Sequence, residues 1–383
     1  MQIARLARQF TKLQAKSISS AALTVKLTDK PKEMLPNNKL VFGQTFSDHM
    51  LTIEYEKEKG WGRPEIKPYQ KLHLDPSCTV FHYAVECFEG MKAYKDKQGK
   101  IRLFRPDMNM TRFLRSCERL KLPSFDKNEL LKCIKEFVKT DSRWIPSERG
   151  YSLYIRPTAI ATQESLGVGE SKKALVFCIA SPVGPYYKTG FSAVKLFAST
   201  DYVRAWPGGT GDAKIGANYA PGILPQLEVA KDGYAQILWL FGDKQNITEV
   251  GTMNCFILWK NEKGEKELVT PPLDGTILPG VTRDSILSLC REWNEFKVTE
   301  KPVTIHDVAK AVKENRVIEM FGAGTAAIVS PIKMIHYNGT DLHIPLDPSK
   351  PDAQAGPLTT KIADTIMGIQ YGEIPHKWSV VVD

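Results

Sequence analysis

The segment GGTGDAKIGANY, residues 208–219, restricts the possible folds of this chain more than any other stretch. Four of its residues are glycine, and glycine loses more conformational freedom on folding than any other residue. Glycine is kept where the backbone turns sharply or approaches another group closely, so this segment is neither a regular helix nor a strand. We expect it to form a loop at the wall of a ligand site.

Lys214 is the one long, reactive side chain among these small residues, and Tyr219 follows five residues later. A lysine in a close-walled pocket can form a Schiff base with an aldehyde cofactor. The alternative is a glycine-rich surface turn whose lysine is solvated. A nucleotide-binding P-loop is excluded, because Ala213 and Ile215 stand where its pattern requires Gly and Ser or Thr.

Length and charge limit the class of protein. The 383 residues are enough for about two domains, and the composition, 42% hydrophobic and 25% charged, is that of a globular protein. The net charge is +9, but residues 1–28 hold five lysines and arginines and no acid, which leaves +4 for the rest. No basic patch with interleaved aromatic residues is visible, so we expect no nucleic-acid partner.

The first residues have a pattern of their own. Apolar and basic side chains fall on opposite faces of a helix of ~3.6 residues per turn. The apolar face comprises Ile3, Leu6, Phe10 and Leu13, and the basic face Arg5, Arg8, Lys12 and Lys16. This pattern predicts a mitochondrial presequence over residues 1–28 and a matrix location, with a frayed basic helix and a cytoplasmic location as the alternative. The sequence contains no run of ~18 consecutive apolar residues, so we expect no membrane insertion.

The seven cysteines include no C-x-x-C pair and are odd in number. The sequence therefore predicts neither a zinc site nor a disulfide framework, and no metal site is expected. We interpret the cysteines as small buried hydrophobic residues in a reducing compartment.

The first half alternates strands and helices in an α+β pattern. We expect a strand at 79–88, a hairpin around 95–99, a helix from Pro106 that carries Arg112, and a helix from Asp126 that opens with a capping box to Glu129. Strands at 151–162 and 174–184 follow. These segments predict a smaller α+β domain over 29–184, an interdomain linker over 185–194, and a larger domain over 195–383.

The larger domain opens with a strand at 193–200, and the glycine-rich loop and a helix at 221–231 follow. Apolar strands at 235–242 and 253–260 place Glu249 and Thr252 at the junction between them. A helix starts at Val281, and its first-turn amides predict an anion site. A capping box at Thr304 and a hairpin through Asn338-Gly339 complete the pattern.

These parts together fit pyridoxal 5'-phosphate. Lys214 would bond to the aldehyde, Glu249 would keep the ring nitrogen protonated, and Val281 and Thr282 would bind the phosphate with Arg112. Taken singly, each of these residues has an ordinary structural interpretation. A dinucleotide fold is the competing hypothesis, since GAGTAA at 322–327 matches G-x-G-x-x-[GA]. Pro331 argues against it, because a long helix would have to follow the glycines.

Several longer runs resemble a known family. They are LVFGQTFSDHML, FEGMKAY, LFRPDMNMTRFLRS, SLYIRP, SLGVG, AKIGANYAP, ITEVGTMN, PPLDGTILPGVTR and MFGAGTAA. Together they resemble the eukaryotic branched-chain amino acid aminotransferases, which are fold type IV pyridoxal phosphate enzymes. The likeness extends from about residue 40 to 371. It implies a two-domain α+β fold with the cofactor at the domain interface, and a homodimer.

The resemblance also implies residue roles. Lys214 is the Schiff-base lysine and acid/base, Tyr219 and Glu249 bond to the cofactor's phenolic oxygen and ring nitrogen, and Thr325 joins the phosphate ligands. The implied substrate pocket has the walls Phe42, Tyr83, Phe88, Tyr154, Tyr186 and Thr252, with Arg156, Thr325 and Ala326 near the carboxylate. Leu166 and Val168 would reach into the neighbouring subunit's site.

The implied reaction is ping-pong transfer of the amino group of leucine, isoleucine or valine to 2-oxoglutarate, which gives glutamate. The alternatives are another fold type IV enzyme, a D-amino acid aminotransferase or an aminodeoxychorismate lyase, and a pyridoxal-binding protein without turnover. One departure stands out. Vertebrate mitochondrial members carry a C-x-x-C pair after the Gly-Thr loop, where this chain has Ala327 and Ser330. We therefore expect no thiol switch at that position.

Overall fold

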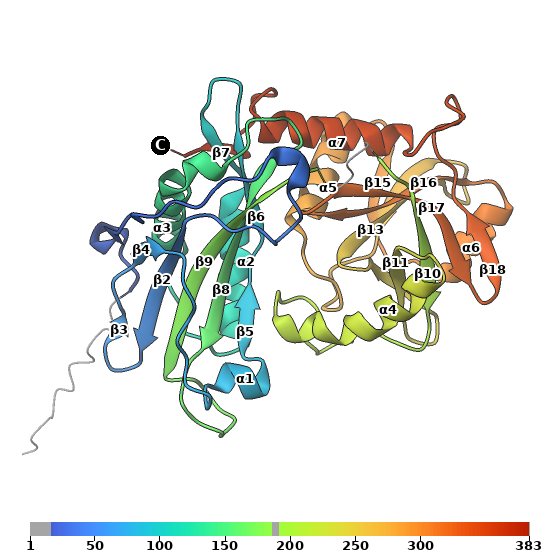
Figure 1. Ribbon diagram of the computed structural model, residues 1–383. Coiled ribbons are helices and arrows are strands. Elements are labelled where there is room, and N and C mark those ends of the chain that lie inside the picture. Colours follow the sequence, from blue (N-terminus) through green and yellow to red (C-terminus); the bar gives the residue numbers. More distant parts are fainter. Residues whose placement is uncertain (1–16, 186–190, 383) are drawn as a thin grey trace, which may run out of the picture.

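A computed structural model describes residues 17–185 and 191–382. Two sheets lie side by side, each covered by helices, and helix α7 runs across the top of the view, where it packs on β16 and β17 of the second sheet and reaches β7 of the first (Figure 1). Among the described residues, no helix combines the length and apolarity needed to cross a bilayer.

The first sheet has ten strands, in the order β1-β4-β2-β9-β8-β6-β7-β19, with β3 on β2 and β5 on β8. Neighbouring strands within this sheet are antiparallel, except that β1 and β4 form a parallel pair. The strands are β1 (Thr24–Val25), β2 (His49–Glu56), β3 (Gly60–Trp61), β4 (Glu65–Pro68), β5 (Glu86–Phe88), β6 (Met91–Lys95), β7 (Ile101–Phe104), β8 (Ser152–Ala161), β9 (Lys173–Val183) and β19 (Ser379–Val381).

Helices α2 (Pro106–Arg119) and α3 (Lys127–Thr140) cover this sheet. Met110, Phe113 and Cys117 recur at helical spacing on α2 and are fully buried in the core between helices and sheet. This buried stripe fixes which face of α2 meets the sheet, and so where Arg112 lies.

The second sheet closes on itself. Its order is β12-β11-β10-β17-β16-β13-β14-β15, with β18 on β17, and the additional pairing of β12 with β13 closes six strands into a small barrel. The strands are β10 (Val194–Ser199), β11 (Gln236–Phe241), β12 (Asn246–Val250), β13 (Met253–Lys260), β14 (Lys266–Thr270), β15 (Lys297–Glu300), β16 (Val317–Gly324), β17 (Ile328–Tyr337) and β18 (Thr340–His343).

Helices α4 (Ile223–Lys231), α5 (Val281–Trp293), α6 (Ile305–Lys313) and α7 (Pro357–Gln370) pack around the barrel. The buried core between the barrel and α5 and α7 also takes in Tyr94 and Phe104 from the first sheet. The two sheets therefore share apolar packing beside the cleft that separates them.

Most predicted elements are confirmed. The hairpin at 95–99, helices α2 to α5, and the strands at 151–162, 174–184, 193–200, 235–242 and 253–260 are present. The Thr304 box is complete, since its hydroxyl accepts from the Asp307 amide and Asp307 accepts from the Thr304 amide. Asn338 and Gly339 both take positive φ angles, as a hairpin turn between β17 and β18 requires.

Three predictions are wrong in detail. Residues 79–83 form a short helix, α1 (Thr79–Tyr83), which ends at Ala84 in the left-handed region, and only 86–88 is strand. Asp126 caps α3, but the Glu129 carboxylate accepts from Ser20 instead of returning to the cap. Glu249 lies within its own strand, β12, rather than in a connection.

The predicted domain boundaries stay predictions, and two features bear on them. Ile18 is buried in the first core and β1 pairs with β4, although both fall within the predicted presequence. At the other end of the chain, β19 pairs with β7 of the first sheet, although its residues fall within the predicted larger domain. The linker lies partly outside the described residues.

Candidate active site

The glycine-rich loop lies between the two sheets and is held by close packing. A side chain on Gly211 would place its Cβ 2.5 Å from that of Ala205, and one on Gly216 would meet the Glu86 carboxylate. The Asn218 amide donates to the carbonyls of Thr210 and Ala213, at 2.7 and 2.8 Å. The glycines are therefore needed for close approach, and the loop is clamped onto itself.

Contacts from outside the loop fix both backbone groups of Lys214. Its N–H donates to the Ser116 hydroxyl of α2 at 2.9 Å, and its carbonyl accepts from the Phe88 amide at 3.0 Å. Its Nζ donates to the Tyr219 hydroxyl at 2.9 Å and lies 4.8 Å from the centre of the Phe88 ring. No carboxylate of the described residues forms an ion pair with it.

Burial lowers the pKa of Lys214 to about 8, and the positive charge of Arg112 acts in the same direction. A sizeable fraction of its amine is then unprotonated near neutral pH, which makes it a nucleophile for a carbonyl. Burial also raises the pKa of the Tyr219 hydroxyl to about 12, so this group stays a hydrogen-bond donor.

Lys214 faces a cavity of about 360 Å³ between the two sheets. Gly280, Val281 and Thr282 line one end of it. Gly280 is the N-cap residue of α5 and supplies no side-chain acceptor, so the amides of Val281, Thr282 and Arg283 have no acceptor within the described chain. Arg112 joins this end of the cavity and donates to the Pro279 carbonyl at 3.0 Å. Free amides, the helix dipole and a guanidinium together suit a phosphate.

Aromatic side chains and one arginine line another part of the cavity, and the lining residues there include Thr252, Thr325 and Ala326. The Phe42 and Tyr154 rings lie 4.9 Å apart, edge to face. The Arg156 guanidinium lies 4.6 Å from the Phe88 ring centre and donates to the Tyr154 hydroxyl at 3.0 Å, while its Nε is buried without a partner. An apolar wall beside an unpaired N–H suits an amino acid with an aliphatic side chain and a carboxylate.

Glu249 lies behind the cavity wall and is not among the lining residues. One oxygen accepts from the Leu278 amide at 2.9 Å and from Asn254 at 3.3 Å, and the other pairs with Arg204 at 2.5 Å. Burial raises its pKa. A carboxylate has room for a further donor, so this arrangement can still accept a protonated ring nitrogen.

The remaining predicted site residues are not brought together in this single chain. Tyr83 lies on the exposed helix α1 and donates to the Leu166 carbonyl. Leu166 and Val168 are 66% and 81% exposed and do not line the cavity. Tyr186 lies outside the described residues.

The competing dinucleotide hypothesis is wrong. The glycines of 322–327 lead from β16 into β17, the two strands are antiparallel, and Pro331 pairs with Phe321 inside the ladder. No helix follows the glycines, so no dipole faces a pyrophosphate there.

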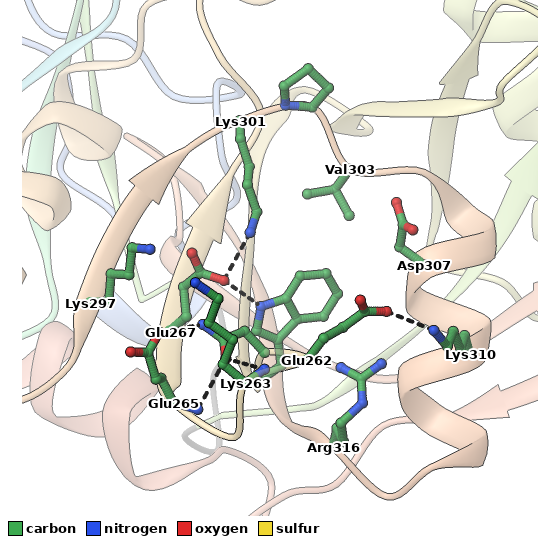
Figure 2. Close-up of a pocket in the computed structure, with 13 residues that line it drawn as sticks. Glu262, Lys263, Glu265, Glu267, Lys297, Lys301, Val303, Asp307, Lys310 and Arg316 are labelled. Carbon is green, nitrogen blue, oxygen red and sulfur yellow. Dashed lines mark hydrogen bonds and ion pairs between the residues drawn. The ribbon is translucent and has the colours of Figure 1, made fainter.

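A second cavity, of about 390 Å³, lies beside the β13–β14 hairpin (Figure 2) and shares no lining residue with the cavity at Lys214. Its carboxylates are already engaged. Glu267 accepts from Lys301, Trp259 and Thr299, and Glu262 pairs with Lys310. Within the part of the chain that the structure describes, none of the buried side-chain atoms that lack a hydrogen-bond partner belongs to a residue lining this cavity.

Three residues that hold the site were missed from sequence. Glu89 accepts from Arg112, Arg204 pairs with Glu249, and Asn254 donates to Glu249. Only Glu89 carried a signal, since it is a charged residue between Phe88 and Gly90 directly after an apolar strand. The sequence around Arg204 and Asn254 gives no indication that either residue belongs to the site.

Comparisons with known proteins agree with this geometry. A model of the family "Amino-transferase class IV" matches residues 86–335. A branched-chain-amino-acid aminotransferase of Dictyostelium discoideum is 60% identical over 94% of this chain and 95% of its own. Relatives named mitochondrial in Schizosaccharomyces pombe and cytosolic in Saccharomyces cerevisiae are each 56% identical, over 93% and 94% of this chain and 84% and 95% of theirs.

Solved structures agree in fold. The branched-chain aminotransferase of Thermoproteus uzoniensis, solved with norvaline, is 26% identical with a TM-score of 0.69, over 88% of this chain and 100% of its own. The enzyme of Thermobaculum terrenum, solved in its PLP form, is 20% identical with a TM-score of 0.68, over 89% and 100%. Fold and site thus define a class IV aminotransferase. Within that class, the chain belongs to the eukaryotic branched-chain amino acid aminotransferases and is a branched-chain-amino-acid transaminase.

Proposed function

We propose that this chain transfers the amino group of leucine, isoleucine or valine to 2-oxoglutarate, with pyridoxal 5'-phosphate as cofactor and glutamate as the second product. The observation that carries this proposal is the Lys214 amine, which has no carboxylate partner within residues 17–185 and 191–382 and shares one cavity with the free first-turn amides of α5.

The residues present fit the cofactor. The amine of Lys214 would bond to its aldehyde, Arg112, Val281, Thr282 and Thr325 would hold its phosphate, and Tyr219 and Glu249 would bond to its phenolic oxygen and ring nitrogen. When bound, pyridoxal phosphate supplies an aldehyde that takes up the amino group and a ring that withdraws electrons from the substrate α-carbon.

The chain's own residues would do the rest. With its pKa lowered to about 8, a fraction of the Lys214 amine is unprotonated near neutral pH, so it could take the proton from the substrate α-carbon and return it elsewhere. The unpaired Arg156 Nε and the Thr325-Ala326 amides would orient the substrate carboxylate. Phe42, Phe88 and Tyr154 would exclude water from around the aliphatic side chain.

Donor specificity tests this proposal. Purified protein with pyridoxal phosphate is assayed with 2-oxoglutarate and either leucine or D-alanine as amino donor. We expect glutamate from leucine and none from D-alanine. Transfer from D-alanine alone would make the protein a D-amino acid aminotransferase, and cofactor binding without any transfer would make it a binding protein.

We further propose a homodimer in which Leu166 and Val168 of one subunit reach the site of the other. In support, both side chains are exposed and stand apart from their own cavity, and the Tyr83 hydroxyl fixes the loop that carries them. The location in the mitochondrial matrix, with the cytoplasm as the alternative, likewise stays a proposal, because relatives of equal identity carry both names.

A further inference from the structure

Glu89 has no place in the scheme above, yet it is fully buried beside the site. It directly follows β5, and its backbone amide donates to the Pro157 carbonyl at 2.8 Å. Its carboxylate accepts four hydrogen bonds, from Arg112 Nε at 2.6 Å, Arg112 Nη2 at 2.9 Å, Asn109 at 2.8 Å and the Gly90 amide at 3.1 Å. A buried carboxylate needs such compensation, and the two bonds to Arg112 are the charged part of it.

These contacts determine what Arg112 can still bind. A guanidinium has five N–H bonds. Glu89 takes two through the paired Nε and Nη2 edge, and the Pro279 carbonyl takes one from Nη1. Two N–H bonds remain without an acceptor in the described chain, and Arg112 lines the cavity beside Val281 and Thr282. With its plane fixed on two sides, the guanidinium is pre-organised toward an anion at the α5 start.

The pair also acts on Lys214. The positive charge of Arg112 lowers the pKa of the Lys214 amine and the negative charge of Glu89 raises it, both secondary to burial. The two charges therefore partly cancel at the lysine nitrogen.

We infer that Glu89 is a positioning residue, which holds Arg112 in place for the cofactor phosphate and offsets its charge at Lys214. This inference rests on the proposed function, since it takes the anion at Arg112 to be the phosphate of pyridoxal phosphate. The geometric statement is that Glu89 holds Arg112 in position. The charge statement is that Glu89 offsets the charge of Arg112 at Lys214. Different substitutions at Glu89 test the two statements separately.

Glu89→Gln and Glu89→Asp are compared with the unmodified holoenzyme. The first measurement is the dissociation of pyridoxal phosphate, and the second is the pH midpoint of the visible absorbance of the lysine-bound cofactor. Glu89→Gln removes the charge and one of the paired acceptors, so we expect cofactor affinity to fall at least about tenfold. Because a negative charge near Lys214 is lost, its nitrogen loses its proton more readily and the midpoint moves to lower pH.

Glu89→Asp keeps the charge but shortens the side chain by one carbon. We expect weaker cofactor binding with a midpoint much closer to that of the unmodified enzyme. Should Glu89→Gln fail to fold, the aspartate variant still decides the geometric statement, because cofactor affinity equal to that of the unmodified enzyme would overturn it. A folded Glu89→Gln with unchanged affinity and midpoint would overturn both statements.

Glu267→Gln is the matched control. Glu267 is also a buried carboxylate with one cationic partner, Lys301, and two neutral donors, but it lies in the second cavity (Figure 2). We expect it to lower the thermal midpoint of unfolding while leaving cofactor affinity and the pH midpoint unchanged. If the control moves both cofactor readouts as Glu89→Gln does, the effect is one of general stability and the inference fails. If the unmodified protein binds no pyridoxal phosphate, the proposed function fails instead.

Discussion

Lys214 stays reactive because its amine is buried without a carboxylate partner among the described residues. This amine has two aromatic neighbours, Phe88 and Tyr219, and donates to the Tyr219 hydroxyl, and burial brings its pKa down to about 8. We predict that Lys214→Ala removes both the visible absorbance of the lysine-bound cofactor and at least about 10⁴-fold of leucine turnover, since covalent attachment and proton transfer are lost together. Absorbance and coupled glutamate assays measure this. Persistent transamination in a folded variant would contradict the mechanism.

Glu249 illustrates the opposite case, a charge kept in place by partners. Arg204, the Leu278 amide and Asn254 hold its carboxylate. We predict that Glu249→Gln still binds cofactor but has a kcat lower by about 10- to 100-fold, because an amide cannot hold the ring nitrogen protonated. Glu319→Gln, at another buried carboxylate that accepts from the first amides of α7, is expected to cost stability without changing kcat. Unchanged turnover in Glu249→Gln would remove the carboxylate from the mechanism.

At the scale of single residues, the sequence predicted the groups that could touch a ligand better than the groups that hold them. Lys214 and the start of α5 follow from local patterns, a glycine-rich loop and a helix start without a cap. Glu89 and Arg204 act through partners 23 and 45 residues away, Arg112 and Glu249, so no local pattern identifies them. Buried charge pairs are a product of tertiary packing.

At the scale of elements, two helices begin in opposite ways. Helix α5 leaves its first amides free in the cavity, whereas α6 satisfies its own through the Thr304 and Asp307 box. We predict that Thr304→Ala lowers the free energy of unfolding by about 1 kcal/mol. Thr365→Ala on α7 is the control, because that hydroxyl only bonds back to the Lys361 carbonyl within the helix, and we expect a change below about 0.5 kcal/mol. Urea denaturation measures both, and equal losses would show that the box does not cap α6.

Of the two positions of the C-x-x-C departure, Ala327 lies in the turn from β16 to β17 and Ser330 lies within β17, paired with Gly322. All seven cysteines lie elsewhere, are buried and free, and burial raises the thiol pKa of Cys255 and Cys290 to about 12. Cys87 and Cys117 have sulfurs 3.4 Å apart, a contact that sequence spacing did not reveal. Like the other cysteines, Cys87 and Cys117 are buried, so oxidants have little access to their thiols.

We therefore predict that mild peroxide leaves aminotransferase activity unchanged. Changing Ala327 and Ser330 together to cysteine should introduce a loss of activity that dithiothreitol reverses. Activity before and after peroxide, with and without reductant, measures this. A reversible loss in the unmodified enzyme would point to another pair, and Cys87 with Cys117 would be the first to test.

The elements that sequence patterns missed share a cause. Residues 79–83 are β-branched and aromatic, yet they form one helical turn that ends at Ala84 in the left-handed region, and no strand among the described residues pairs with them. Strand β12 was missed because Asn246 and Glu249 interrupt its apolar pattern, although Glu249 is buried against a partner charge. Strand propensity depends on packing against neighbouring strands, and for both segments the local sequence does not show which neighbours are present.

At the scale of the whole molecule, the first described residues belong to the folded protein. Ile18 is 2% exposed within the core beside α3, and Ser20 donates twice to Glu129 at 2.7 Å. Removing residues through 28 would expose that core, whereas removing 1–16 breaks none of these contacts.

We predict that residues 1–28 carry a fluorescent protein into mitochondria, that Arg5→Glu with Arg8→Glu leaves it in the cytosol, and that processing of the full chain ends at or before Ser17. Fluorescence microscopy and mass spectrometry of the mature N-terminus measure this. Import of the glutamate variant would contradict the presequence, and a mature chain that begins after Ile18 would contradict the processing limit.

Strand β19 has a consequence for how the protein is made. It pairs with β7, and the paired residues are 275 to 279 positions apart in the chain. A ribosome working at about 5–20 residues per second therefore makes β7 about 14–56 s before β19. During that interval β7 is an open edge, and its backbone groups can pair with any strand nearby. The nascent chain thus has one unprotected edge on the first sheet until β19 has been synthesised. We expect a chaperone that covers this edge to be most useful during that period.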